Sequence, residues 1–212
     1  EVIIDYSGSS PQAKGPINAT LGVAWSAAFN AMLHLTDQSI PKNSGCFRPI
    51  RVIAPAGTIM NVDYPGSEVG GNTETHPLIV CAIFGAMANC VPQRVMASEG
   101  TTHGCFVFGG HDKVTDEPFG GFDFSYVGYG GRSFADGNDA TDSINGNCAN
   151  TPMEVFETRF PWIVEEYALR PDSGGAGRHR GGLSNVKQML CTGEMLVSQM
   201  TNKHKIGAWG LK

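Results

Sequence analysis

The chain has 212 residues, a formal net charge of −5 and only 17% charged residues. This charged fraction lies well below the roughly 25% of an average globular domain and excludes a disordered chain, because disorder requires high charge and little apolar mass. The acidic balance disfavours non-specific nucleic-acid binding, which needs clustered lysine and arginine. No stretch approaches about eighteen apolar residues, so we expect no membrane span.

Glycine accounts for 28 of the 212 residues, well above its usual share of about 7%. Because glycine is costly inside helices and permits tight turns, this composition predicts a strand-and-loop body. The six cysteines show no CxxC spacing, so neither a zinc knuckle nor a thioredoxin-type site is indicated. We therefore expect six reduced thiols in a cytoplasmic protein.

The first expected elements are a strand over residues 1–10, an amphipathic helix over residues 16–36 and a strand over residues 47–54. Pro16 suits the first turn of this helix, where its missing N–H costs nothing. Apolar residues then recur at helical spacing and should form the buried face. They are Leu21, Ala24, Trp25, Ala28, Phe29, Met32 and Leu35.

A second helix is expected over residues 76–90. Thr75 resembles its N-cap and Pro77 a first-turn proline. Cys81 and Cys90 are expected to be small core residues. A stripe of mostly small residues marks one face: Leu78, Cys81, Ala82, Gly85 and Ala88.

From about residue 100 to 150 no helical period survives, and glycines punctuate short aromatic strands. A short helix is expected over residues 152–160, and strands over residues 164–170, 183–192 and 195–201. Gly193-Glu194 suits a hairpin turn between the last two strands. No linker is visible. The sequence therefore predicts an α+β fold over residues 1–212 as a single domain, with a glycine-rich, strand-dominated body and two main helices.

The first segment with potential for chemistry is Gly70-Gly71-Asn72-Thr73-Glu74-Thr75-His76, at the start of the second helix. Consecutive glycines and free N–H groups there would let the backbone approach an anion. Asn72 would add a donor, and Glu74 and His76 would add two bases. A tight turn with an elaborate cap explains the same residues.

The second segment is Glu99-Gly100-Thr101-Thr102-His103-Gly104, followed by His111 and Asp112. The two histidines would be metal ligands if the chain between them formed a hairpin, but their spacing is not diagnostic, and hydrogen-bonding or structural roles are favoured. The histidine of the first run is a candidate acid or base, because the ordinary pKa of histidine lies near neutrality.

The third segment, residues 170–182, places Arg178, His179 and Arg180 among glycines, a composition that suits phosphate capture. The favoured interpretation is structural: Arg170 pairs with Asp172 while the glycines turn the chain between two strands. The sequence contains no GxxxxGK[ST], GxSxG or HExxH run, and no GxGxxG follows a strand. A nucleotide site would therefore have to come from elsewhere.

Six segments in one order, over nearly the whole chain, resemble the B-type subunit of the hydantoinase/oxoprolinase family. That family includes ATP-dependent N-methylhydantoinases, 5-oxoprolinases, lactamases and the acetone and acetophenone carboxylases. The segments are Asp5-Tyr6-Ser7-Gly8-Ser9-Ser10-Pro11-Gln12, Gly15-Pro16-Ile17-Asn18-Ala19, Ile40-Pro41-Lys42-Asn43-Ser44-Gly45-Cys46-Phe47-Arg48-Pro49-Ile50, Gly70-Gly71-Asn72-Thr73-Glu74-Thr75, Asn150-Thr151-Pro152-Met153-Glu154 and Leu169-Arg170-Pro171-Asp172-Ser173-Gly174-Gly175-Ala176-Gly177-Arg178.

This resemblance implies a hetero-oligomer. An A-type partner with an actin-like ATPase fold binds ATP and phosphorylates the small-molecule substrate or bicarbonate, and the B-type subunit then hosts hydrolysis or carbon–carbon bond formation. Family subunits are more than twice this long, so we expect an internal portion of a longer chain. The family's metal ligands lie N-terminal to this portion. Any divalent metal is therefore expected there, and no metal ligand is carried over to this chain.

The first functional hypothesis is the B-type subunit of an ATP-dependent cyclic-amide hydrolase that opens hydantoin, 5-oxoproline or lactam rings. The alternatives are the corresponding subunit of an ATP-dependent ketone carboxylase and a non-catalytic scaffold portion of either. The chain has Asn145-Gly146-Asn147-Cys148 where many relatives carry a His-Met-Thr-Asn run, and this departure leaves the substrate open.

If chemistry takes place in this portion, Glu74 and His103 are the candidate catalytic residues. Asn72, Thr101 and Thr102 are the candidate substrate-binding residues. Arg178 and Arg180 are weaker candidates for the site than these five residues.

Overall fold

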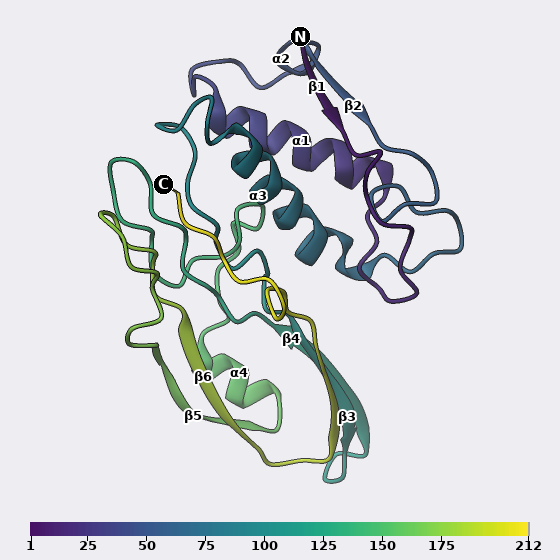
Figure 1. Ribbon diagram of the computed structural model, residues 1–212. Coiled ribbons are helices and arrows are strands. Elements are labelled where there is room, and N and C mark those ends of the chain that lie inside the picture. The colour runs from purple at the N-terminus through teal and green to yellow at the C-terminus, as the bar shows by residue number, and fades with distance from the viewer. Residues whose placement is uncertain (212) are drawn as a thin grey trace.

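The computed structural model describes residues 1–211 and confirms an α+β fold. In the upper half of Figure 1, helices pack on a small parallel sheet. In this sheet β1 (Val2–Asp5) pairs with β2 (Ile50–Ile53). Helix α1 (Leu21–Leu35) lies against it and packs on α3 (His76–Met87), and the short α2 (Ser44–Phe47) precedes β2. Within residues 1–211 no helix is both long and apolar enough to cross a membrane.

Helix α1 begins at Leu21, so the expected start at residue 16 is wrong. The hydroxyl of Thr20 accepts a hydrogen bond from the backbone N–H of Val23 and forms the N-cap. Pro16 lies instead in a loop that the fully buried Asn18 holds together, and the amide of Asn18 donates to three backbone carbonyls. The hydrogen bonds of Asn18 explain why this stretch does not join the helix.

The buried face of α1 agrees in part with the predicted one. Ala24, Ala28, Met32 and Leu35 are buried as expected, whereas Leu21 and Trp25 are exposed and the additional alanines Ala27 and Ala31 are buried. Helix α3 buries its larger residues, including Ile79, Val80 and Phe84, whereas most of the small-residue stripe faces outward. Close packing of α1 against α3 favours alanine at their contact, because a short side chain allows the backbones to approach.

Helix α3 ends at Met87 rather than at residue 90. Cys81 is buried in the helix as expected, but Cys90 lies beyond its end and is exposed, so the prediction of a core position for Cys90 is wrong. All six cysteines are free thiols.

The lower half of Figure 1 contains two antiparallel sheets and α4 (Met153–Arg159). In the first sheet β3 (Phe106–Asp112) lies between β4 (Glu117–Asp123) and β7 (Met195–Gln199). The second sheet pairs β5 (Trp162–Leu169) with β6 (Asn185–Cys191). The short helix and the C-terminal strands are confirmed. The hairpin at Gly193-Glu194 is not, because β6 and β7 belong to different sheets.

An aromatic core joins these two sheets to α4. Phe106 and Phe108 from β3 pack with Phe156 from α4 and Trp162 from β5. The ring of Phe108 meets those of Phe156 and Trp162 edge-on, with centroids 5.6 Å apart in both pairs. Edge-to-face contacts of this kind add specificity to apolar burial.

Glycines allow the loop that follows β4 to pack backbone to backbone against the loop between β5 and β6. A Cβ on Gly128 would overlap with the backbone of Gly182. We therefore expect Gly128→Ala to lower the free energy of unfolding by about 2–3 kcal/mol, measured by denaturant unfolding of the complete protein. Gly8→Ala, which has no atom within 4 Å of its new Cβ, is the control and should change it by less than about 0.5 kcal/mol. Equal stability of both variants would contradict this packing.

Candidate active site

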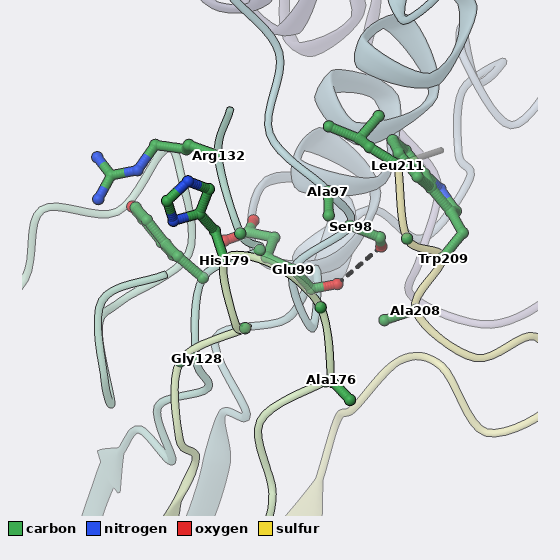
Figure 2. A pocket seen from close by; sticks show the side chains of 18 of the residues that line it. Ala97, Ser98, Glu99, Gly128, Arg132, Ala176, His179, Ala208, Trp209 and Leu211 are labelled. Carbon is green, nitrogen blue, oxygen red and sulfur yellow. Dashed lines mark hydrogen bonds between the residues drawn. The ribbon is translucent and has the colours of Figure 1, made fainter. Parts of the chain in front are cut away.

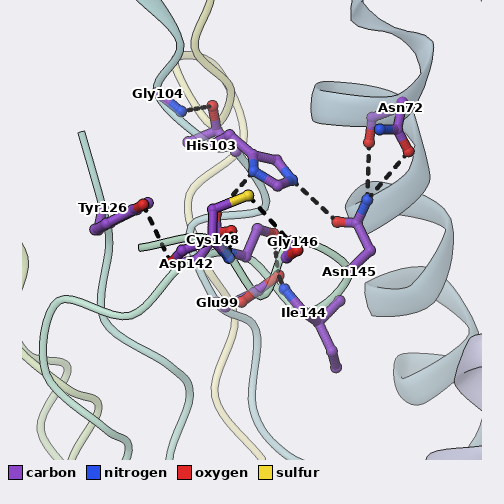
Figure 3. Close-up of polar contacts among 12 residues, drawn as sticks. Asn72, Glu99, His103, Gly104, Tyr126, Asp142, Ile144, Asn145, Gly146 and Cys148 are labelled. Atoms are coloured by element: carbon purple, nitrogen blue, oxygen red, sulfur yellow. Dashed lines mark hydrogen bonds and ion pairs between the residues drawn. The ribbon is translucent and has the colours of Figure 1, made fainter. Parts of the chain in front are cut away.

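Polar side chains from distant parts of the chain meet beside the start of α3, and most of them are buried, although Asn72 is exposed (Figure 3). We call this set the polar cluster. Its members are Asn72, Glu74, Glu99, His103, Asp142 and Asn145.

His103 is the centre of the polar cluster and is 3% exposed. Its Nδ1 lies 2.7 Å from a carboxylate oxygen of Asp142, and its Nε2 lies 3.2 Å from Oδ1 of Asn145. Burial alone would lower the pKa of His103, but the Asp142 carboxylate and the Asn145 oxygen outweigh it, and the pKa is raised. Both ring nitrogens face acceptors, so the geometry favours the doubly protonated imidazolium.

Asp142 is fixed by the backbone that surrounds it. Its carboxylate accepts hydrogen bonds from the N–H groups of Ser143 at 2.8 Å and Cys148 at 3.0 Å, in addition to the contact with His103. Burial raises the pKa of Asp142, but these donors outweigh it and the net shift is downward. Asp142 therefore carries a negative charge in the interior, next to a positive histidine.

Asn145 connects this ion pair to the segment before α3. While its oxygen faces His103, its amide nitrogen donates to the backbone carbonyl of Asn72 at 3.0 Å. Asn72 lies in the π-helical turn Gly71–Thr75 that leads into α3. Turns of this kind are frequent at functional sites.

Glu74 comes from the same π-helical turn and is 2% exposed. Neither of its carboxylate oxygens has a hydrogen-bond partner among the described residues. Burial raises the pKa of Glu74 from 4.5 to about 7, although Thr102 and the positive His103 act in the opposite direction. At neutral pH Glu74 is therefore divided between its acid and its carboxylate.

Asn202 joins the two segments that the sequence marked for chemistry. Its side-chain nitrogen donates to the backbone carbonyls of Glu74 at 2.9 Å and Thr101 at 2.6 Å. Thr101 is fully buried, has a positive φ of 52° and carries a hydroxyl without a partner among residues 1–211. Backbone strain at a buried polar residue is typical of functional sites.

Glu99 forms the other side of the polar cluster. One of its oxygens accepts from the hydroxyl of Ser143 at 2.6 Å and from the N–H of Ile144 at 3.2 Å. Its second oxygen has no partner within the described part of the chain. Burial is the main reason why the pKa of Glu99 is raised. The acid form of Glu99 is therefore favoured more strongly than in water.

The next three residues of the predicted segments make contacts within the fold. The hydroxyl of Thr102 accepts from the N–H of Gly104 at 2.9 Å, which is a structural contact. Gly70 donates to the carbonyl of Pro16. A Cβ on Gly71 would overlap with the carbonyl of Asn18. These glycines therefore bring the backbone close to a neighbouring loop, which favours the tight turn over an anion site at this helix start.

His76 does not supply a second base to the polar cluster. It is 4% exposed, and its Nε2 lies 3.3 Å from the side-chain nitrogen of Asn30. Burial lowers the pKa of His76 to about 4, so the ring is neutral at physiological pH.

The two histidines considered as a metal pair do not converge. His103 is buried in the polar cluster, whereas His111 lies near the far end of β3, opposite Pro118, and is exposed. Residues 1–211 contain no group of three or more His, Cys, Asp or Glu side chains arranged to hold a metal ion.

The basic loop between β5 and β6 turns the chain between two strands, as the structural interpretation expected. Its Gly181 donates to the carbonyl of Gly175, and Gly182 donates to that of Tyr129, so these N–H groups have backbone partners. The expected pair of Arg170 and Asp172 is absent from the ion pairs of residues 1–211.

Sequence reasoning missed Asp142 and Asn202 as members of this region. Both lie in irregular chain without helical or strand periodicity, so no pattern marks which face their side chains take. Asn145 stands out in the sequence only as a departure from the family pattern. Its contacts with His103 and Asn72 become visible only in the fold.

Comparison with known proteins decides the family. The model of the family described as Hydantoinase B/oxoprolinase matches residues 1–212. The chain belongs to the hydantoinase B/oxoprolinase family. One relative in a Pseudomonas species is named as the putative B component of a D-/L-hydantoinase. It is 30% identical over 217 residues, which cover 99% of this chain and 36% of the relative.

Two solved structures share the fold. The nucleotide-free structure of an ATP-dependent acetone carboxylase has a TM-score of 0.86 at 22% identity, covering 99% of this chain and 29% of that one. The ATP-dependent caprolactamase from Pseudomonas jessenii has a TM-score of 0.75 at 27% identity, covering 85% of this chain and 32% of that one. The chain spans 16% to 36% of the length of the curated relatives that it matches.

Proposed function

We propose that this chain is the catalytic portion of the B-type subunit of an ATP-dependent cyclic-amide hydrolase. In this proposal an A-type partner phosphorylates the amide oxygen of a hydantoin, 5-oxoproline or lactam ring. At the polar cluster water adds to the activated ring carbon and the carbon–nitrogen bond breaks, and hydrolysis of the resulting acyl phosphate leaves a carboxylate and inorganic phosphate. The observation that carries the proposal is the buried ion pair of His103 and Asp142, with Glu74 close enough for its charge to affect His103. The similarity to a hydantoinase component and to a caprolactamase supports the substrate class.

The cluster offers the two proton transfers that amide hydrolysis needs. Glu74, with a pKa of about 7, is suited to accept a proton from the attacking water. His103, held as an imidazolium by Asp142, is suited to donate the Nε2 proton that it now shares with Asn145 to the departing ring nitrogen. One group gains a proton and the other loses one, so the charge of the cluster is conserved.

ATP is assigned to the partner in this proposal. In the loop between β5 and β6, the N–H groups of Gly181 and Gly182 donate to backbone carbonyls and are not free to bind a nucleotide phosphate.

The ketone carboxylase is the alternative from the same family. The likeness to acetone carboxylase is at 22% identity and supports the fold alone. The test is to purify the complete A/B complex and supply ATP with a ring amide or a ketone, each with and without bicarbonate. We expect ATP-dependent ring opening that is independent of bicarbonate. Bicarbonate-dependent carboxylation of a ketone, without ring opening, would overturn the proposal.

A further inference from the structure

A large cleft lies next to the polar cluster and is not part of it. Its volume is about 1260 Å³, which exceeds the roughly 300–1,000 Å³ of most small-molecule sites. The outward face of α3 forms one wall, the loops over residues 127–133 and 173–184 form others, and residues 208–211 close one side (Figure 2).

One side of this cleft is basic. Figure 2 shows Arg132 and His179 together there, and Arg178 also lines the cleft. Arg178 is exposed and has no ion pair within residues 1–211. Arg132 is held in place by the carbonyl of Asp136, to which it donates at 3.0 Å. The carboxylate of Asp136 lies 3.6 Å from His179. This single negative charge stands against the two positive charges of Arg132 and Arg178, so this side of the cleft has an excess of positive charge.

The opposite side is apolar and aromatic. Trp209 and Leu211 lie there in Figure 2. Trp209 is anchored because its carbonyl accepts from the N–H of Ser98 at 2.9 Å, and its ring packs against Gly85 of α3. The small-residue stripe of α3 thus makes room for an indole, since a Cβ on Gly85 would crowd the ring.

The cleft and the polar cluster share one residue, Glu99. It lines the cleft, and its carboxylate binds Ser143, whose own N–H donates to Asp142. A molecule that contacts Glu99 in the cleft would therefore be connected to Asp142 through Glu99 and Ser143.

We propose that this cleft binds a small molecule that combines a ring-sized apolar body with one negatively charged group. The anion lies against Arg132 and Arg178, and the body packs on Trp209. The anion is a carboxylate of a substrate or product, or the phosphoryl group of an activated intermediate, since arginine binds both. The location of this site goes beyond the proposed function, whereas the identity of its ligand as a substrate, product or activated intermediate, and the choice of ring amides as probes, rest on it.

Binding to the complete A/B complex, measured by isothermal titration calorimetry without ATP, tests this assignment. The probes are 5-oxoproline, which has a ring and a carboxylate, hydantoin, a ring of similar size without a carboxylate, and inorganic phosphate. Arg178→Ala should weaken binding of 5-oxoproline about tenfold or more and leave hydantoin unchanged. Arg51→Ala, an exposed arginine on β2 away from the cleft, is the matched control and should change neither.

Phosphate separates the two sources of the anion. Competition by phosphate that Arg178→Ala abolishes assigns the basic side to a phosphoryl group, and competition by 5-oxoproline alone assigns it to a carboxylate. The proposal is overturned if 5-oxoproline does not bind, or binds equally well to the wild type and Arg178→Ala. Because binding is measured without turnover, its failure is separate from a failure of ring opening.

Discussion

Asp142→Asn should lower kcat for ring opening about 1,000-fold while the complex still assembles. Asparagine has nearly the same shape but cannot balance the charge of a buried imidazolium, so the pKa of His103 should fall and the ring should lose one of its two protons at lower pH than in the wild type. Steady-state assays from pH 5 to pH 9 measure this. Activity that requires protonated His103 declines as the pH rises through its pKa, and the variant should show that decline at lower pH.

The control for this variant is Asp139→Asn. Asp139 lies three residues earlier and accepts from the N–H of Leu183 at 2.7 Å, outside the polar cluster. We expect its kcat to stay within about twofold of the wild type, as for most surface substitutions. If Asp142→Asn retained both the wild-type kcat and the wild-type pH profile, the ion pair would have no part in the reaction.

Glu74→Gln should lower activity and raise stability at the same time. Loss of the proposed general base is expected to reduce kcat about 100-fold or more. The buried carboxyl has a pKa of about 7 in the folded chain against 4.5 ordinarily, so the folded state binds the proton more tightly. The wild type therefore loses stability as the pH rises from about 4.5 to 7, and glutamine, which never ionises, avoids this loss.

Thermal and denaturant unfolding of the complete protein at pH 4.5 and pH 8 measures the stability effect. The variant should match the wild type at the lower pH and be more stable at the higher pH by about 2 kcal/mol. Glu68→Gln, at an exposed position in the preceding loop, should change neither activity nor stability. A Glu74→Gln protein that is fully active, or less stable than the wild type at pH 8, would contradict the role assigned to this carboxyl.

Much of the fold follows from periodicity, and its errors have physical causes. Helices α1, α3 and α4 and most strands lie where apolar spacing predicts them. The start of α1 was misplaced because Asn18 binds backbone carbonyls and holds Pro16 outside the helix. The small-residue stripe of α3 is visible in the sequence, but its partner is not, because Gly85 faces Trp209, more than 100 residues away. No local pattern reveals such a partner.

The sequence indicates some residues of the candidate site and not others. Glu74 and His103 stand in two polar, glycine-flanked runs, and the fold brings those runs together through Asn202. Asp142, which sets the charge of His103, lies in a loop without periodicity. The sequence thus identified which groups could carry protons. Which of them is held positive and which is left near half-ionised depends on burial and on partners from distant loops.

The coupling between ATP consumption and ring opening tests most directly whether the chemistry takes place in this chain. Both rates would be measured in the A/B complex with the wild-type or the Asp142→Asn chain, after size-exclusion chromatography has shown equal assembly. A catalytic polar cluster predicts that the variant still consumes ATP in the presence of the ring amide but forms less than about 1% of the wild-type product. Ring opening at the wild-type rate in the assembled variant would contradict it and leave this portion a scaffold.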